Sequence, residues 1–150
     1  MLRLKRCRRA IINEFSMKQL SNKKYDLEER TARFGEMIID LVKEIPITPI
    51  NRRIIEQLVG SGGSTGANYC EATEAESRQD FIHKVGICKK EIKEARHWLR
   101  LLARSNPEFK DKIAKVWKEA QELLLIFSQT IKTTRNNREK NSKNNYLNID

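Results

Sequence analysis

Apolar residues recur at alternating intervals of three and four positions through most of this chain, which contains only three prolines. This spacing places them on one face of an α-helix, and no segment alternates in the manner of a β-strand. The sequence therefore predicts an all-α protein, an antiparallel up-down-up-down four-helix bundle. The expected inward positions are Leu27, Thr31, Phe34, Ile38, Leu41 and Ile45; Asn51, Ile55, Leu58, Gly62, Thr65, Tyr69 and Ala72; Phe81, Val85, Cys88, Ile92, Ala95, Leu99 and Leu102; and Phe109, Ile113, Val116, Ala120, Leu123, Phe127 and Thr130.

Polar residues and prolines mark the expected helix ends. Asp26 with Glu29, and Ser77 with Asp80, have the spacing of capping pairs at helix N-termini. Thr48 before Pro49 predicts the start of the second helix, with threonine as the cap and proline in the first turn. Asn106 before Pro107 gives the same signal for the fourth helix.

The stretch "VGSGGSTGANYCEA" at residues 59–72 contains four of the six glycines. A phosphate-binding loop requires a lysine after its last glycine and a strand before its first, and this stretch has neither. The helical register of the second segment instead continues through it. Small residues allow two helix backbones to approach closely. We therefore predict a helix here, with Gly62, Gly66 and Thr65 at a close helix–helix contact.

Charge is unevenly distributed along the chain, whose net charge is +10. Residues 1–24 are strongly basic, residues 25–80 have a net charge of −5, and residues 81–130 have a net charge of +5. We expect a flexible basic arm at 1–24, a helical domain at 25–132 and a flexible Asn/Lys-rich tail at 133–150. Basic arms on a polarised body favour an anionic partner, with nucleic acid preferred over a membrane. The alternative is that the tails serve solubility.

Basic residues form a stripe one position beyond the apolar face of the third segment. Phosphate contacts by such a stripe would give binding without sequence readout. Because Glu91 and Glu94 lie among these residues, ion pairs within or between subunits are an open alternative. The candidate nucleic-acid-binding residues are Lys89, Lys93, Arg96 and Arg100 in the stripe, Lys112, Lys115 and Lys118 in the fourth segment, and Arg6, Arg8 and Arg9 in the N-terminal arm.

Apolar side chains exceed what one bundle can bury in the fourth segment, where Trp117, Leu124 and Ile131 widen the apolar face. This excess predicts self-association. No catalytic, cofactor or metal site is expected: Cys70, His83, Cys88 and His97 match no familiar zinc spacing. The acidic group Glu71, Glu74 and Glu76 has no opposed acid. The odd cysteine count and the absence of a long apolar run favour a cytoplasmic protein without a membrane partner.

Three blocks, "YDLEERTARFGEMIIDLVKEIP", "NRRIIEQLVGSGGSTGANYCEATEAES" and "DFIHKVGICKKEIKEARHWLRLL", resemble the four-helix bundle proteins encoded in intervening sequences of bacterial 23S ribosomal RNA genes. The resemblance spans about residues 25–130. More distantly, the chain is similar to accessory proteins of diversity-generating retroelements, which partner a reverse transcriptase. The resemblance implies an up-down bundle, a homopentameric barrel, a nucleic-acid role and no catalytic residues. Thr65 departs from the family pattern, which has an apolar β-branched residue there.

Together these observations predict a non-enzymatic, oligomeric protein that binds RNA or DNA through basic faces and arms. The ligand expected from the resemblance is ribosomal RNA that carries an intervening sequence. The alternative is an oligomeric protein–protein scaffold, or an accessory subunit of an enzyme such as a reverse transcriptase, that does not itself contact nucleic acid.

Overall fold

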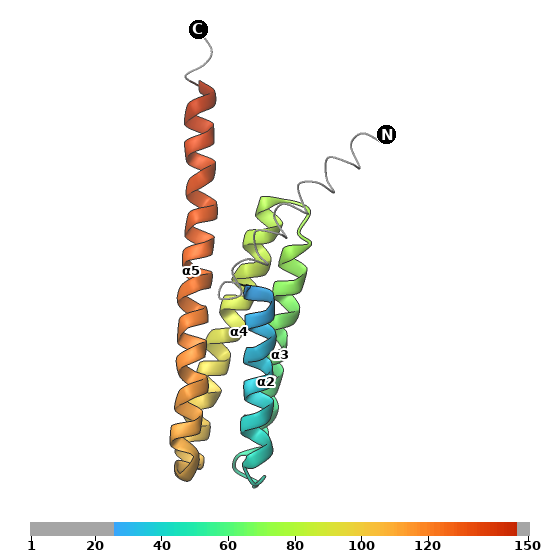
Figure 1. Ribbon diagram of the computed structural model, residues 1–150, viewed down its shortest axis with the longest axis vertical. Coiled ribbons are helices and arrows are strands. Elements are labelled where there is room, and N and C mark those ends of the chain that lie inside the picture. Colours follow the sequence, from blue (N-terminus) through green and yellow to red (C-terminus); the bar gives the residue numbers. More distant parts are fainter. Residues whose placement is uncertain (1–25, 147–150) are drawn as a thin grey trace.

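The computed structural model describes residues 26–146, with side chains described for residues 26–136. Successive helices run antiparallel and lie side by side (Figure 1). No strand occurs in the described residues, so the all-α prediction is confirmed. Within this range the chain forms α2 (Leu27–Glu44), α3 (Arg52–Thr73), α4 (Arg78–Ser105) and α5 (Lys110–Tyr146), with the short 3-10 helix η1 (Pro107–Phe109) before α5.

One apolar core joins all four helices. Phe34, Leu58, Leu99 and Phe127 come one from each helix, and each is fully buried. Burial of a side chain of this size stabilises the fold by roughly 1.5–3 kcal/mol, so the core provides the largest favourable contribution. Nearly every inward position expected from the heptad spacing is buried. Those that are only partly buried lie toward the helix ends or at the edge of the core: Leu27, Tyr69, Phe81, Phe109 and Thr130.

The glycine-rich stretch lies inside α3, as predicted, and its close neighbour is α2 of the same chain. A Cβ added at Gly62 would overlap the Cδ1 atom of Ile38, and a Cβ added at Gly66 would lie 3.6 Å from the carbonyl oxygen of Thr31. Gly35 of α2 faces Gly62 in turn. No glycine in the described residues has a positive φ. These glycines therefore provide space for a neighbouring helix rather than an unusual backbone conformation.

Thr65 also belongs to the buried face of α3, whereas two glycines of the block do not. Thr65 is fully buried, and its hydroxyl donates a 2.9 Å hydrogen bond to the carbonyl oxygen of Ser61. A threonine can therefore stand in the core because the helix itself satisfies its hydroxyl. Gly60 and Gly63 point the other way, and a Cβ added at either would meet nothing within 4 Å. Only part of the glycine block is thus needed for packing between α2 and α3.

Helix caps follow the sequence signals at two of the predicted starts. The Asp26 carboxylate accepts hydrogen bonds from the backbone N–H groups of Glu28 and Glu29 at the start of α2. The Ser77 hydroxyl accepts one from the Asp80 N–H at the start of α4. Each cap satisfies a backbone donor that has no partner within the helix.

The predicted start of α3 at Thr48 is wrong, because the helix begins at Arg52. Thr48 and Asn51 instead close a turn: the Thr48 N–H donates to the Asn51 side chain, and the Asn51 N–H donates to the Thr48 hydroxyl. The fully buried Asn51 amide also donates to the carbonyl oxygen of Pro46 and to the side chain of Asn106. The two turns at this end of the bundle are therefore joined by a buried hydrogen bond.

Helix α5 is the longest element and extends beyond the end of the other helices (Figure 1). Its 37 residues rise about 55 Å, against about 27 Å for the 18 residues of α2. The helix continues past residue 132, where the sequence predicts a flexible tail. Residues 133–146 contain no glycine or proline that would end a helix. The predicted basic arm at 1–24 lies outside the described residues.

Candidate nucleic-acid interface

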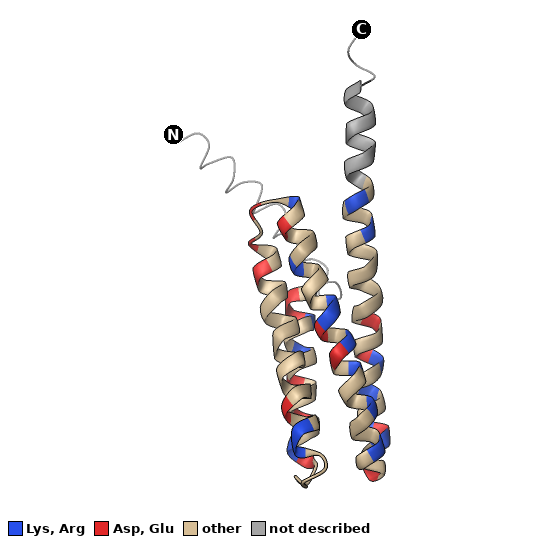
Figure 2. Cartoon of the chain, turned by 180° about the vertical axis from the view of Figure 1, so that it is seen from behind, with Lys and Arg blue, Asp and Glu red and all other residues tan. Residues whose placement is uncertain are grey.

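The basic stripe of α4 lies along the flank of the bundle that α4 shares with α5. Its four members each follow a buried core position of α4. One of them, Arg96, contacts Trp117 of α5. Lys93 and Arg100 are exposed, while Lys89 and Arg96 are half-buried. Figure 2 shows basic positions along α4 and along the first half of α5. This flank therefore presents a row of cations along the helix axis.

An aromatic side chain from α5 joins this row. The guanidinium carbon of Arg96 lies 4.6 Å from the centroid of the Trp117 ring, in a cation–π contact. Trp117 remains 38% exposed, and the Nε atom of Arg96 is buried without a hydrogen-bond partner. The contact holds a planar cation in place on the surface of the flank. The sequence predicts both residues as site residues but does not predict that they touch.

Ion pairing does not neutralise the stripe among the described residues. No ion pair there involves Lys89, Lys93, Arg96 or Arg100. Glu94 instead accepts a 3.0 Å hydrogen bond from the indole nitrogen of Trp98. Burial, reinforced by the nearby Glu94 charge, raises the pKa of Glu91. Among residues 26–136, the alternative of ion pairs within the chain is therefore not realised on this flank.

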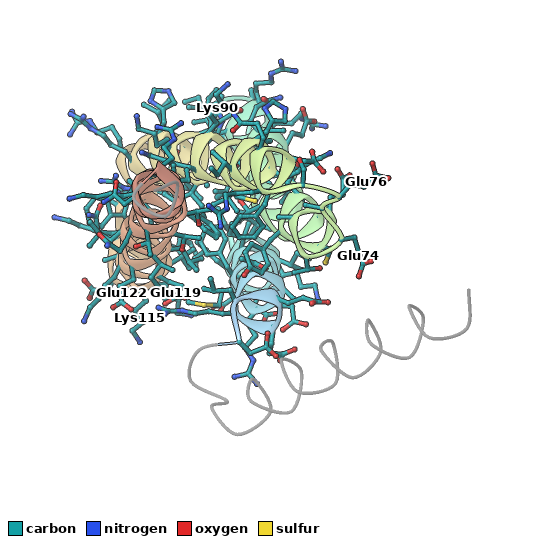
Figure 3. All side chains as sticks on the ribbon, turned by 90° about the horizontal axis from the view of Figure 1, so that it is seen from above. Glu74, Glu76, Lys90, Lys115, Glu119 and Glu122 are labelled. Atoms are coloured by element: carbon teal, nitrogen blue, oxygen red, sulfur yellow. The ribbon has the colours of Figure 1, made fainter. Side chains whose placement is uncertain are left out.

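The lysines of α5 are distributed around that helix rather than gathered beside the stripe. Lys112 pairs with Glu44 of α2. Lys115 lies on the same side of α5 as Glu119 and Glu122, away from Lys90 of α4 (Figure 3). Lys118 is exposed. The compact basic surface of the described residues is thus the α4 stripe with Trp117, while Arg6, Arg8 and Arg9 lie outside the described residues.

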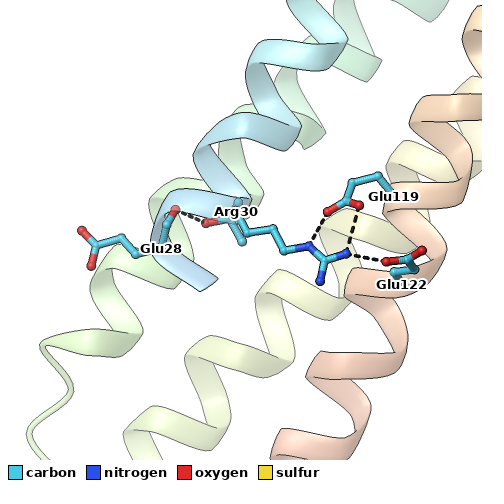
Figure 4. A network of polar contacts seen from close by, with 5 residues as sticks. Glu28, Arg30, Glu119 and Glu122 are labelled. Atoms are coloured by element: carbon cyan, nitrogen blue, oxygen red, sulfur yellow. Dashed lines mark hydrogen bonds and ion pairs between the residues drawn. The ribbon is translucent and has the colours of Figure 1, made fainter. Parts of the chain in front are cut away.

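The opposite flank of α5 carries a polar network that ties it to α2 (Figure 4). The Nε and Nη2 atoms of Arg30 donate to the two oxygens of Glu119 at 2.6 and 3.0 Å, and Nη2 also donates to Glu122 at 2.6 Å. The Glu119 hydrogen bonds are the largest factor that raises the pKa of Arg30. A bidentate arginine–carboxylate pair fixes geometry as well as charge. Arg30 is therefore occupied by structural partners.

Acidic side chains gather at one end of the α3–α4 pair, whereas exposed apolar side chains occur on every helix. Glu74 and Glu76 project from the connection between α3 and α4, on the far side from α5 (Figure 3). Leu125 on α5 is 60% exposed. Of the predicted self-association residues, Trp117 contacts Arg96, whereas Leu124 and Ile131 are half-buried against the chain's own core. Exposed apolar side chains also occur on the other three helices, at Ile39, Val59 and Leu101.

No group of three potential metal ligands occurs in the part of the chain that the structure describes. Cys88 is fully buried, and its burial raises the pKa of the thiol to about 12, so it remains protonated at neutral pH. An open hollow of about 460 Å³ lies between the start of α2 and α5, lined by Leu27, Arg30, Ile126, Gln129 and three threonines. Among the described residues, no helix is both long and apolar enough to cross a membrane.

The fold defines the class of this molecule: it is an all-α protein of four packed helices, with a basic flank on α4. The chain belongs to the family described as 23S rRNA-intervening sequence protein, whose model matches residues 23–129. Its fold is similar to a crystal structure of a protein with unknown function from the S23 ribosomal protein family of Bacteroides thetaiotaomicron. The two chains share 30% identity with a TM-score of 0.62, over 70% of this chain and 97% of the other. A comparison with curated proteins finds no match.

Proposed function

We propose that this protein binds nucleic acid without catalysing a reaction, in the cytoplasm, and that it does so as a homo-oligomer. The observation that supports this proposal is the α4 stripe: four cations in a row, with no acidic partner among the described residues, beside an exposed tryptophan. Such a row can follow a phosphate backbone, whose charges are regularly spaced. We propose RNA as the ligand because the family is described by its link to 23S rRNA.

The salt dependence of RNA binding tests this proposal. Four phosphate contacts release about four counterions, so affinity for duplex RNA is expected to fall roughly a hundredfold between about 50 and 200 mM salt. Fluorescence anisotropy with the full-length protein and labelled RNA measures this slope, and duplex DNA of the same sequence is the parallel ligand. A protein that binds neither these duplexes nor the corresponding single strands at about 50 mM salt does not have the proposed activity.

Self-association is supported by a separate observation, the exposed apolar residues on all four helices. Leu125 and its counterparts on the other faces leave apolar surface that a second copy can cover. Residues 25–80, which include α2 and α3, have a net charge of −5, and residues 81–130, which include α4 and much of α5, have a net charge of +5. These opposite charges favour contact between the acidic face of one copy and the basic face of the next. The family resemblance implies a homopentamer. A ring of five copies would combine weak phosphate contacts into a higher overall affinity.

Light scattering tests the assembly directly. We expect a mass of five times the 17.6 kDa of one chain, and a smaller mass for Leu125→Glu, because a buried charge without a partner opposes association. Gln79→Glu, which also adds one negative charge, at an exposed position in the first turn of α4, is the matched control. A wild-type mass of 17.6 kDa would contradict self-association. An oligomer that binds no RNA would instead support the alternative function, a protein scaffold.

A further inference from the structure

The Arg96–Trp117 pair has a geometry that a simple phosphate contact does not require. A phosphate needs only a nearby positive charge, which the flexible, exposed Lys93 supplies equally well. Arg96 is instead held against the Trp117 ring, with its Nε atom buried. The guanidinium carbon lies over the indole ring, 4.6 Å from its centroid. Arg96 as a whole is only half-buried, so part of its side chain is accessible to a ligand. The pair therefore presents a flat, fixed, positively charged platform.

Flat cationic and aromatic platforms bind unpaired nucleobases. Bases that are not paired in a duplex stack on aromatic rings and on arginine guanidinium planes, whereas the bases of a duplex are already stacked on one another. Lys93 and Arg100 lie on the same face of α4, near enough in sequence to Arg96 to contact phosphates on either side of such a base. Glu94, the acidic residue closest in sequence to Arg96, accepts a hydrogen bond from the Trp98 indole and forms no ion pair with Arg96 among the described residues.

We propose that Arg96, supported by Trp117, stacks an unpaired base of a single-stranded nucleic acid, so that the α4 flank prefers single strands to duplexes. This inference rests on the proposed nucleic-acid binding and makes it more specific. The base, the guanidinium and the indole form three layers. Lys93 and Arg100 bind the adjoining phosphates. Because stacking requires only a planar base, the contact does not distinguish one base from another.

The test compares Arg96→Lys with wild type on a single strand of about 12 nucleotides and on its duplex, at one salt concentration. Lysine keeps the charge but has no plane. We expect Arg96→Lys to bind the single strand about tenfold more weakly and the duplex within twofold of wild type. Arg104→Lys, an exposed residue of the same helix that lies outside the stripe, is the matched control and should change neither affinity more than twofold. Single strands of RNA and of DNA show which sugar the flank accepts.

A second pair of variants tests the platform beneath the arginine. Trp117→Phe keeps an aromatic ring and should retain single-strand binding within about threefold, whereas Trp117→Leu should lose affinity as Arg96→Lys does. Thermal unfolding confirms that each variant is folded. Equal losses on single strand and duplex, or no loss with Arg96→Lys, would overturn the stacking role while leaving the proposed nucleic-acid binding intact. If the wild type binds no nucleic acid, the proposed function itself fails.

Discussion

Replacing Gly62 by leucine is expected to destabilise the bundle by about 3 kcal/mol, because the new side chain has no space between α2 and α3. Its Cβ alone would overlap Cδ1 of Ile38, a side chain that is fully buried. Three further carbon atoms would follow into the same contact. For a domain of this size the melting temperature should fall by roughly 10 °C, which thermal unfolding followed by circular dichroism measures.

Gly63→Ala is the matched control for this prediction. Gly63 is the neighbouring residue in the same helix, but it is exposed and a Cβ there would meet nothing within 4 Å. Alanine is favoured over glycine in a helix interior, so Gly63→Ala should stabilise the protein by about 0.5–1 kcal/mol. If Gly62→Leu unfolds at the same temperature as wild type, the close contact between α2 and α3 at Gly62 does not contribute to the stability of the fold.

Most of the fold could be predicted from the sequence because its determinants are local. The heptad spacing assigns the buried face of each helix, and side chains such as Asp26 and Ser77 mark a helix start through bonds to residues two or three positions away. The start of α3 could not be predicted in this way. Asn51 is fixed by a buried hydrogen bond to Asn106, which is 55 residues away in sequence, and this long-range contact moves the helix start beyond Thr48.

The neighbour of the glycine block also depends on long-range packing. The sequence indicates that Gly62 and Gly66 allow a close approach, but it does not distinguish a helix of the same chain from a helix of another subunit. The structure places α2 of the same chain there, through Ile38 and Thr31. Gly35, an isolated glycine at the middle of α2, was the available signal, because two helices that both carry glycine at one level can approach each other there.

The candidate interface was predictable in composition but not in grouping. The spacing of Lys89, Lys93, Arg96 and Arg100 determines that they share a face of one helix. Whether α5 lysines join them depends on how α5 is turned, and Lys112 is turned toward Glu44 of α2. The contact between Arg96 and Trp117 follows from register: each lies one position beyond a core residue in neighbouring antiparallel helices. Sequence spacing alone does not determine that register.

Reversing three charges of the stripe is expected to abolish most RNA binding. The variant Lys93→Glu/Arg96→Glu/Arg100→Glu removes three phosphate contacts and places three carboxylates beside the backbone. Affinity at about 100 mM salt should therefore fall more than roughly a hundredfold, and the salt slope should decrease by about three. Two of the three side chains are exposed, so the fold should tolerate the change. Fluorescence anisotropy across several salt concentrations measures both quantities.

A charge-matched control separates a local interface from a general field effect. Lys43→Glu/Arg52→Glu/Arg53→Glu changes the net charge by the same amount at exposed positions of α2 and α3. If long-range attraction by the net charge dominates, the two triple variants lose affinity equally, and the α4 flank is not the interface. Deletion of residues 1–16, which removes Arg6, Arg8 and Arg9, measures how much the N-terminal basic arm contributes to affinity in the same assay. An arm that carries the binding produces the large loss on deletion and leaves the stripe variant close to wild type, because phosphate contacts contribute only where the RNA lies.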